Sequence, residues 1–214
     1  MPRLEEDYIY HVYNRGVDKR EIFSCDNDRR RFISCLYFYN DLNSAKNITR
    51  LVELTMGTQD ERDKLVEILA FVLMPNHFHL LLKPVAQDGI SEFMKKIGIG
   101  YTHYFNIKYD RTGCLFQGKY KHTRIDTEEQ LQYIPFYIHF NPLGLINPDW
   151  KQRTLENFDR SFDFLKTYPW SSLGEYVGNS TNYSMIIDKS ILSENFGKPK
   201  ELMSEIKNWL KTLI

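Results

Sequence analysis

Two histidines stand one residue apart between apolar stretches, in the run FVLMPNHFHLLL that covers residues 71–82. If this run is a β-strand, His77 and His79 lie on the same face because side chains alternate between faces along a strand. Two imidazoles side by side are half of a metal site. The competing interpretation is a chance His-x-His pair packed in a core. The hypothesis of a metal site therefore depends on further ligands elsewhere in the chain.

Further candidate groups lie in residues 127–141, which have the pattern of a helix. Tyr137 and Asn141 are four residues apart, which places them on one helix face about 5–6 Å apart at their β-carbons. The Asn141 oxygen could complete a set of ligands begun by His77 and His79. A phenol, with a pKa of about 10, is a weak nucleophile that a nearby divalent cation would activate. Attack on phosphorus would leave a covalent phosphotyrosine. The alternatives are a packing role for Tyr137 and a helix-terminating role for Asn141 before Pro142.

A basic segment separates these two sets of residues. Residues 93–124 carry seven lysines and arginines against one acid, with aromatic residues between them. Basic groups bind a phosphate backbone, and aromatic faces stack on unpaired bases, so the segment favours nucleic-acid binding. The alternative is a solvated helix face over core aromatics, which explains the helical part equally well but explains the loop at residues 115–121 less well. The candidate DNA contacts are Lys95, Lys96, Arg111, Gln117, Lys119, Lys121 and Arg124.

The composition limits the remaining possibilities. The chain has 214 residues, 42% of them hydrophobic and 14% aromatic, and this is sufficient for one globular domain with an extension. Its formal net charge is zero, so affinity for nucleic acid must come from a local surface. The three cysteines form no Cys-x-x-Cys pair, and no signal peptide or membrane-spanning run is apparent. These features predict a cytoplasmic protein without a membrane partner.

The elements expected around these residues have the order β-α-β-β-α-β, followed by a helix. The strands are expected at residues 8–13, 65–74, 77–83 and 120–126, and the helices at 26–41, 90–109 and 127–141. Asp26 or Asn27 is the expected cap of the first helix, and residues 43–64 are expected to be a connecting excursion. The order predicts an α+β ferredoxin-like sandwich, an antiparallel sheet with helices mainly on one face. Residues 1–145 would form the domain, and the aromatic-rich residues 146–214 an extension packed on it.

Three motifs in order resemble the single-tyrosine transposases of insertion sequences, including the REP-associated tyrosine transposases. They are LMPNHFHLL at residues 73–81, GCLFQGKYK at 113–121 and YIHFNPL at 137–143. YNRG at residues 13–16 and WSS at 170–172 are also similar. The resemblance covers residues 8–145, with a weaker match to about residue 177.

The resemblance implies an HUH-type enzyme, named for its histidine–hydrophobe–histidine motif, which His77-Phe78-His79 matches. It implies that Tyr137 is the nucleophile, that Asn141 is the third metal ligand, and that magnesium or manganese is the cofactor. Tyr133, one helical turn earlier, is the alternative nucleophile. The implied activity is cleavage and rejoining of single-stranded DNA at hairpin-bearing ends through a 5′-phosphotyrosine, leading to DNA transposition. Monomer and homodimer are both compatible with the sequence.

Two other functions are alternatives to a transposase. A non-catalytic nucleic-acid-binding module on the same sandwich, such as a domesticated or inactive copy, would stack bases on sheet aromatics and would not need the histidines. A zinc-dependent hydrolase would need a general-base carboxylate near the histidines, and residues 74–82 contain none.

Overall fold

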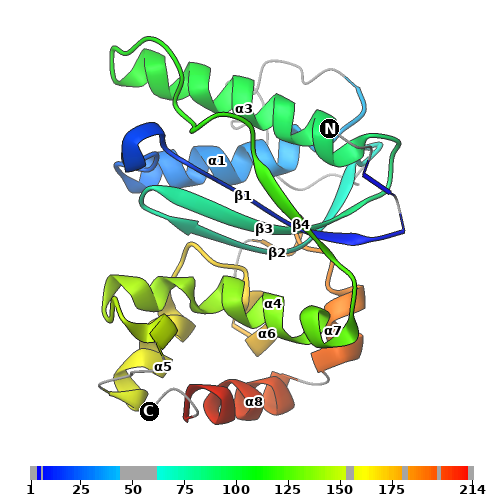
Figure 1. Cartoon of the computed structure of the whole chain (residues 1–214), viewed down its shortest axis with the longest axis vertical. Helices are drawn as coiled ribbons and strands as arrows, with labels where there is room; N and C mark the ends of the chain where they lie inside the picture. Colours follow the sequence, from blue (N-terminus) through cyan, green and yellow to red (C-terminus); the bar gives the residue numbers. More distant parts are fainter. Residues whose placement is uncertain are drawn as a thin grey trace.

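The computed structural model describes residues 4–5, 7–43, 62–152, 157–179, 183–196 and 199–211. These residues form three layers, in which a four-stranded sheet lies between two groups of helices (Figure 1). One layer contains α1 (Asp26–Phe38) and α3 (Gly89–Lys108), and the other begins with α4 (Glu128–Phe140). The expected excursion at residues 43–64 falls largely outside the described residues. None of the helices in the described ranges is long and apolar enough to cross a membrane.

The sheet contains β1 (Ile9–Arg15), β2 (Val66–Met74), β3 (His77–Pro84) and β4 (Lys121–Ile125). Its strand order is β2-β3-β1-β4, and every paired neighbour is antiparallel. Residues 66–74 and 78–82 are almost entirely buried, as expected of apolar strands covered on both faces. Together with the element order, this topology confirms the predicted ferredoxin-like α+β fold.

Helices α1 and α3 cover one face of the sheet through aromatic contacts. Phe32 on α1 packs against Phe78 on β3 with 4.9 Å between ring centroids, and Tyr101 on α3 contacts Phe32 at 5.0 Å. Tyr101 also donates a hydrogen bond to the Ile22 carbonyl, so the loop before α1 is attached to α3. Phe78 lies between the two histidines in sequence, and its burial on this face directs both histidines to the other face.

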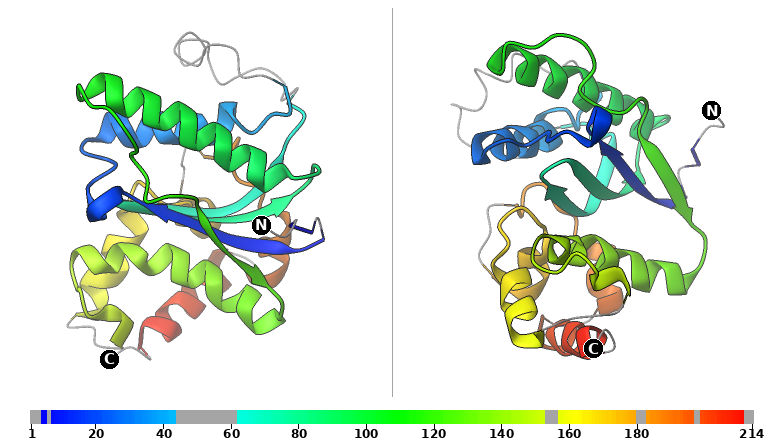
Figure 2. Two further views of the ribbon diagram at one scale, coloured as in Figure 1. Left: turned by 45° about the horizontal axis from the view of Figure 1, so that its top comes forward. Right: turned by 60° about the vertical axis from the view of Figure 1, so that its left-hand side comes forward.

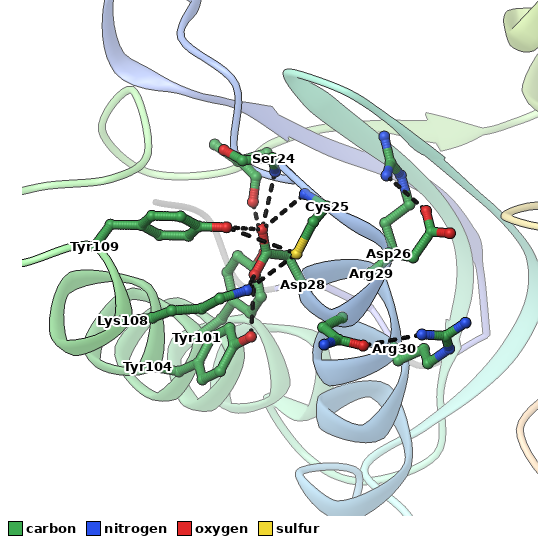
Figure 3. A network of polar contacts seen from close by, with 12 residues as sticks. Ser24, Cys25, Asp26, Asp28, Arg29, Arg30, Tyr101, Tyr104, Lys108 and Tyr109 are labelled. Carbon is green, nitrogen blue, oxygen red and sulfur yellow. Dashed lines mark hydrogen bonds and ion pairs between the residues drawn. The ribbon is translucent and has the colours of Figure 1, made fainter.

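A buried carboxylate joins the start of α1 to the end of α3 (Figure 3). Asp28 is fully buried and accepts hydrogen bonds from the Lys108 ammonium, the Tyr104 and Tyr109 hydroxyls, and the backbone amides of Ser24 and Cys25. The predicted cap at Asp26 or Asn27 is therefore wrong by one or two residues. Cys25 is the N-cap residue, and Asp28 completes a capping box with it.

The second helical layer covers the opposite face of the sheet (Figure 2). Thr127 is the N-cap of α4, and its hydroxyl accepts from the Gln130 amide. The Gln130 side chain accepts from the amide of Asp126, whereas in a capping box it would accept from that of Thr127. After α4 come η2 (Asn141–Leu145), η3 (Trp150–Gln152), α5 (Phe158–Thr167), α6 (Leu173–Val177), α7 (Ser190–Phe196) and α8 (Pro199–Lys211). The helices therefore cover both faces, because α4 and the C-terminal residues add a layer to the one that the β-α-β-β-α-β order predicts.

Residues after 145 also cover the outer edge of β2. Phe71 donates its amide proton to the Ser172 hydroxyl and accepts from the Ser172 amide, and Leu73 donates to the Trp170 carbonyl. Farther along the strand, the Asp188 amide donates to the Ile68 carbonyl. A buried Ser172–His139 contact of 2.9 Å connects this edge to α4. The C-terminal residues are thus hydrogen-bonded to the sheet along most of the length of β2.

Candidate active site

The two histidines of the HUH motif lie on one face of β3, a central strand of the sheet. In the register with β1, His79 is opposite Tyr13 and His77 is opposite Arg15, so all four side chains share this face. The two imidazole rings are 5.2 Å apart and nearly perpendicular. His79 is buried, with 6% of its surface exposed, and His77 is half-buried.

Helix α4 places Tyr137 over these rings. The Tyr137 ring lies 5.7 Å from that of His79 and 5.9 Å from that of His11, edge-on to both. Tyr133 lies one turn earlier on α4, is 47% exposed, and contacts Tyr137 and Trp209. Of the two candidate nucleophiles, Tyr137 is therefore the one that contacts the histidines.

Each imidazole uses its Nδ1 atom in a hydrogen bond within the protein. Nδ1 of His77 is 2.6 Å from the Asn76 side-chain oxygen, and Nδ1 of His79 is 2.8 Å from Nε2 of His11. Burial lowers the pKa of His77 to about 4, with a further lowering from Lys151, and burial also lowers the pKa of His79. Both rings are therefore neutral at pH 7, as a metal ligand must be.

Asn141 lies beside this pair, at the C-terminal end of α4. Its side-chain nitrogen donates to the Tyr137 carbonyl at 2.7 Å, so the amide oxygen remains for another partner. The Asn141 side chain is within hydrogen-bonding reach of His77, which opposes the lowering of the pKa of His77 by burial. Within the described ranges, no group of three His, Cys, Asp or Glu side chains could hold a metal ion. A divalent cation here would therefore depend on Asn141 in addition to the two imidazoles, and oxygen plus imidazole ligands suit magnesium or manganese.

A lysine from the C-terminal residues contacts the phenol. Lys151, on η3, donates a hydrogen bond to the Tyr137 hydroxyl at 3.0 Å, and its ammonium lies 4.8 Å from the centre of the Tyr137 ring. The same positive charge contributes to the lowered pKa of His77, after burial, and to that of His79, after burial and the charges of His11 and His77. The ammonium is therefore close to the nucleophile candidate and to both imidazoles.

These groups line one cavity of about 380 Å³. Its basic side chains come from four separate segments and no carboxylate lines it, so the cavity is suited to a phosphate group. The lining residues are Tyr13, Asn14, Arg15, Lys19, Asn76, His77, His79, Gln117, Lys121, Tyr137 and Lys151.

The structure distributes the predicted DNA contacts over two surfaces. Gln117 and Lys121 line the cavity beside the histidines. Lys95 and Lys119 line a second cavity of about 450 Å³, together with Phe78 and α3 residues. Since Phe78 is on the opposite face of β3 from the histidines, the two pairs of side chains lie on different faces of the sheet.

The other three predicted DNA contacts have partners within the protein, as do Lys95, which pairs with Glu92, and Gln117, which accepts from Arg15. Arg124 forms ion pairs with Glu5 and Asp126. Lys96 donates to backbone carbonyls of residues 41–43. Arg111 donates to the Asn106 side chain at 3.0 Å. The segment that is basic in sequence therefore does not form a single basic surface.

Four residues of the site were not singled out from the sequence. Arg15 and Lys19 lie outside the basic segment 93–124, and the similarity of YNRG at residues 13–16 is the signal that points to Arg15. His11 precedes Tyr13 and Arg15 at two-residue spacing, which could have placed it on the same strand face. Lys151 follows all three principal motifs, and no signal in the sequence connects it to Tyr137.

The chain is similar to known proteins in sequence and in fold. Residues 42–141 match the family model of IS200-like transposases, a segment that contains both histidines, Tyr137 and Asn141. The resemblance to single-tyrosine transposases is confirmed. The chain is also similar to a solved structure of a REP-associated tyrosine transposase bound to a REP hairpin, with 15% identity, a TM-score of 0.49, and coverage of 89% of this chain and 93% of that one. No curated protein matches the chain.

Proposed function

We propose that this chain is a metal-dependent DNA transposase that cleaves and rejoins single-stranded DNA through Tyr137. The observation that carries the proposal is the cavity in which Tyr137, His77 and His79 meet four basic side chains and no acid. A tyrosine nucleophile needs its target phosphate next to it, and the basic lining provides electrostatic attraction for a phosphodiester. The family match over residues 42–141 supports the same function.

In the proposed cleavage step, the Tyr137 hydroxyl oxygen attacks the phosphorus of a DNA phosphodiester. The new bond is phosphorus to Tyr137 oxygen, and the bond that breaks is phosphorus to the 3′ oxygen. The phenolic proton is lost to solvent, and the leaving 3′ oxygen takes up a proton. The products are a 5′-phosphotyrosine and a free 3′-hydroxyl. In the reverse reaction, the 3′-hydroxyl of another end attacks the phosphotyrosine and releases the phenol, so that two strands are joined.

The side chains around Tyr137 have separate tasks in this proposal. Lys151 donates to the Tyr137 oxygen and stabilises its negative charge when it loses its proton before attack and when it leaves during rejoining. Arg15, Lys19 and Lys121 hold the phosphates on either side. His77, His79 and Asn141 would hold magnesium or manganese, which when bound withdraws charge from the scissile phosphate. A DNA hairpin or single strand is the proposed partner.

The test is covalent capture of labelled hairpin DNA in the presence of manganese, analysed on a denaturing gel. Wild-type protein should give a shifted, covalent band that chelation of the metal removes. Tyr137→Phe should abolish the band but retain DNA binding, because it removes only a hydroxyl. Tyr133→Phe is the matched control on the same helix and should retain the band.

Two outcomes would count against the proposal. A covalent band formed by Tyr137→Phe would exclude Tyr137 as the nucleophile. Metal-independent DNA binding with no covalent band on any hairpin tested would favour the non-catalytic binding module.

A further inference from the structure

His11 forms a buried contact with one of the two proposed metal ligands. Its Nε2 atom is 2.8 Å from Nδ1 of His79, and the two rings stack with 5.0 Å between centroids and an angle of 23°. Both residues are 6% exposed. His11 lies on β1 opposite Leu81, so it is a diagonal neighbour of His79 on the same face of the sheet. The contact therefore joins two central strands beneath Tyr137.

A hydrogen bond between two neutral imidazoles contains a single proton. The ring that donates this proton determines whether Nε2 of His79 has a free lone pair. If His79 donates from Nδ1, its Nε2 atom keeps a free lone pair. If His11 donates from Nε2, His79 must carry its own proton on Nε2. Only the first arrangement lets Nε2 of His79 bind a cation.

We propose that His11 is a positioning residue that accepts the Nδ1 proton of His79 and so holds His79 in the tautomer with a free Nε2. The choice of this tautomer rests on the function proposed above, because the 2.8 Å contact by itself fits either ring as the donor. A metal-bound histidine generally donates its other ring N–H to a carboxylate, a carbonyl or water, which fixes both tautomer and orientation. Here a second imidazole has that role.

The neighbouring ligand shows why a specific acceptor matters. Nδ1 of His77 lies 2.6 Å from the Asn76 side-chain oxygen, which can only accept, so that contact by itself fixes the tautomer of His77. An imidazole partner can donate or accept, and the His79 tautomer therefore depends on His11 carrying its proton on Nδ1. His11 lies outside the segment 42–141 that matches the transposase family, so that match assigns it no role.

The test measures the tautomers in the metal-free protein. Long-range ¹H–¹⁵N correlation spectra of ¹⁵N-labelled protein distinguish a proton on Nδ1 from one on Nε2, and His79→Gln assigns the His79 signals. Wild-type protein should show the Nδ1–H form of both His79 and His11. An Nε2–H form of His79 in the wild type would overturn the proposal, whether or not any variant folds.

Three substitutions extend the test. His11→Phe keeps a ring of similar shape but removes the acceptor, so His79 should lose its preference for Nδ1–H. His11→Gln places an amide oxygen near the former Nε2 position and should restore the preference. His122→Phe is the matched control, because His122 pairs with Val12 and lies on the opposite face of the sheet. It should leave the His79 signals unchanged.

Manganese binding, measured by calorimetry in the absence of DNA, provides a second measurement. His11→Phe should weaken binding by about 10- to 100-fold, the usual effect of losing an outer partner of a metal ligand. His11→Gln should stay within a few-fold of wild type. Unchanged binding together with an unchanged His79 tautomer in His11→Phe would refute the role of His11. If wild-type His79 shows the Nδ1–H form but the protein neither binds manganese nor forms a covalent adduct, the positioning role stands and the proposed function fails.

Discussion

Asp28→Asn should strongly destabilise the fold, because the substitution removes a buried charge from the junction of α1 and α3. Asp28 is fully buried, and its two oxygens accept five hydrogen bonds. The variant has nearly the same shape but can accept at only one oxygen. Depending on which oxygen the amide nitrogen replaces, two or three of the five donors lose their acceptor, and the Lys108 ion pair is lost in both cases.

The size of the effect follows from those contacts. A hydrogen bond to a charged group contributes about 1.5–3 kcal/mol, so two or three lost contacts correspond to about 3–9 kcal/mol. The lower end applies here because the Lys108 side chain is 31% exposed and can be rehydrated. We therefore expect the free energy of unfolding to fall by about 3 kcal/mol.

Urea denaturation at pH 7, followed by fluorescence, measures this change. Asp26→Asn is the control, since Asp26 is the adjacent acid and its surface pair with Arg29 leaves its side chain 60% exposed. The control should lose less than about 1 kcal/mol. Equal losses for the two variants would refute the reasoning.

The dependence on pH gives a second check of the same residue. Burial acts to raise the pKa of Asp28, but hydrogen bonds from Lys108, Tyr109 and Tyr104 outweigh it, and the net pKa is lowered. The stabilisation by ionised Asp28 is therefore complete above the ordinary aspartate pKa of about 3.9 and is lost as pH falls through the lower value of the folded state. The difference in stability between wild type and Asp28→Asn should be constant near neutral pH and should narrow in acid.

Three further predictions concern DNA, the nucleophile and the C-terminal residues. Lys121→Gln should reduce the salt dependence of single-stranded DNA binding by about one phosphate contact, whereas Arg124→Gln should reduce it less because Glu5 and Asp126 already neutralise Arg124; equal slopes would contradict this. Lys151→Gln should slow covalent adduct formation by about tenfold. This is a smaller effect than the loss of a buried oxyanion donor, because Lys151 is exposed. In a filter-binding assay, the affinity for DNA should change less than the rate of adduct formation. Ser172→Ala should lower the free energy of unfolding by about 1–3 kcal/mol because the buried Phe71 amide loses its acceptor, and a smaller loss in thermal denaturation would weaken the inferred attachment of the C-terminal residues.

The sequence predicted the elements and the faces of residues well because those properties are local. The two-residue spacing of His77 and His79 and the four-residue spacing of Tyr137 and Asn141 determine which side chains share a face. The strand order also follows from the sequence of elements. The ends of these strands and helices moved by up to three residues, and the helical layer on the second face was not expected from the order alone.

Residues whose partners are distant along the chain could not be predicted in this way. His11 meets His79 across 68 residues, and Arg124 meets Glu5 across 119. A count of charges in a segment does not show that Lys96 donates to backbone carbonyls or that Arg124 is paired with two carboxylates. Such pairings depend on strand register and on loop positions, which the local pattern does not contain.

The hydrogen bonds along β2 also affect how the molecule can associate with other chains. An exposed strand edge is a template for strands of another chain and promotes aggregation or domain swapping. In this protein the amides and carbonyls of β2 near Phe71 and Leu73 are already bonded to residues 168–172, while β4 pairs only with β1 among the described strands. Strand addition by a second copy would therefore be directed to β4, the edge that carries Lys121, and a protein shortened to residue 145 would expose a long apolar edge prone to aggregation.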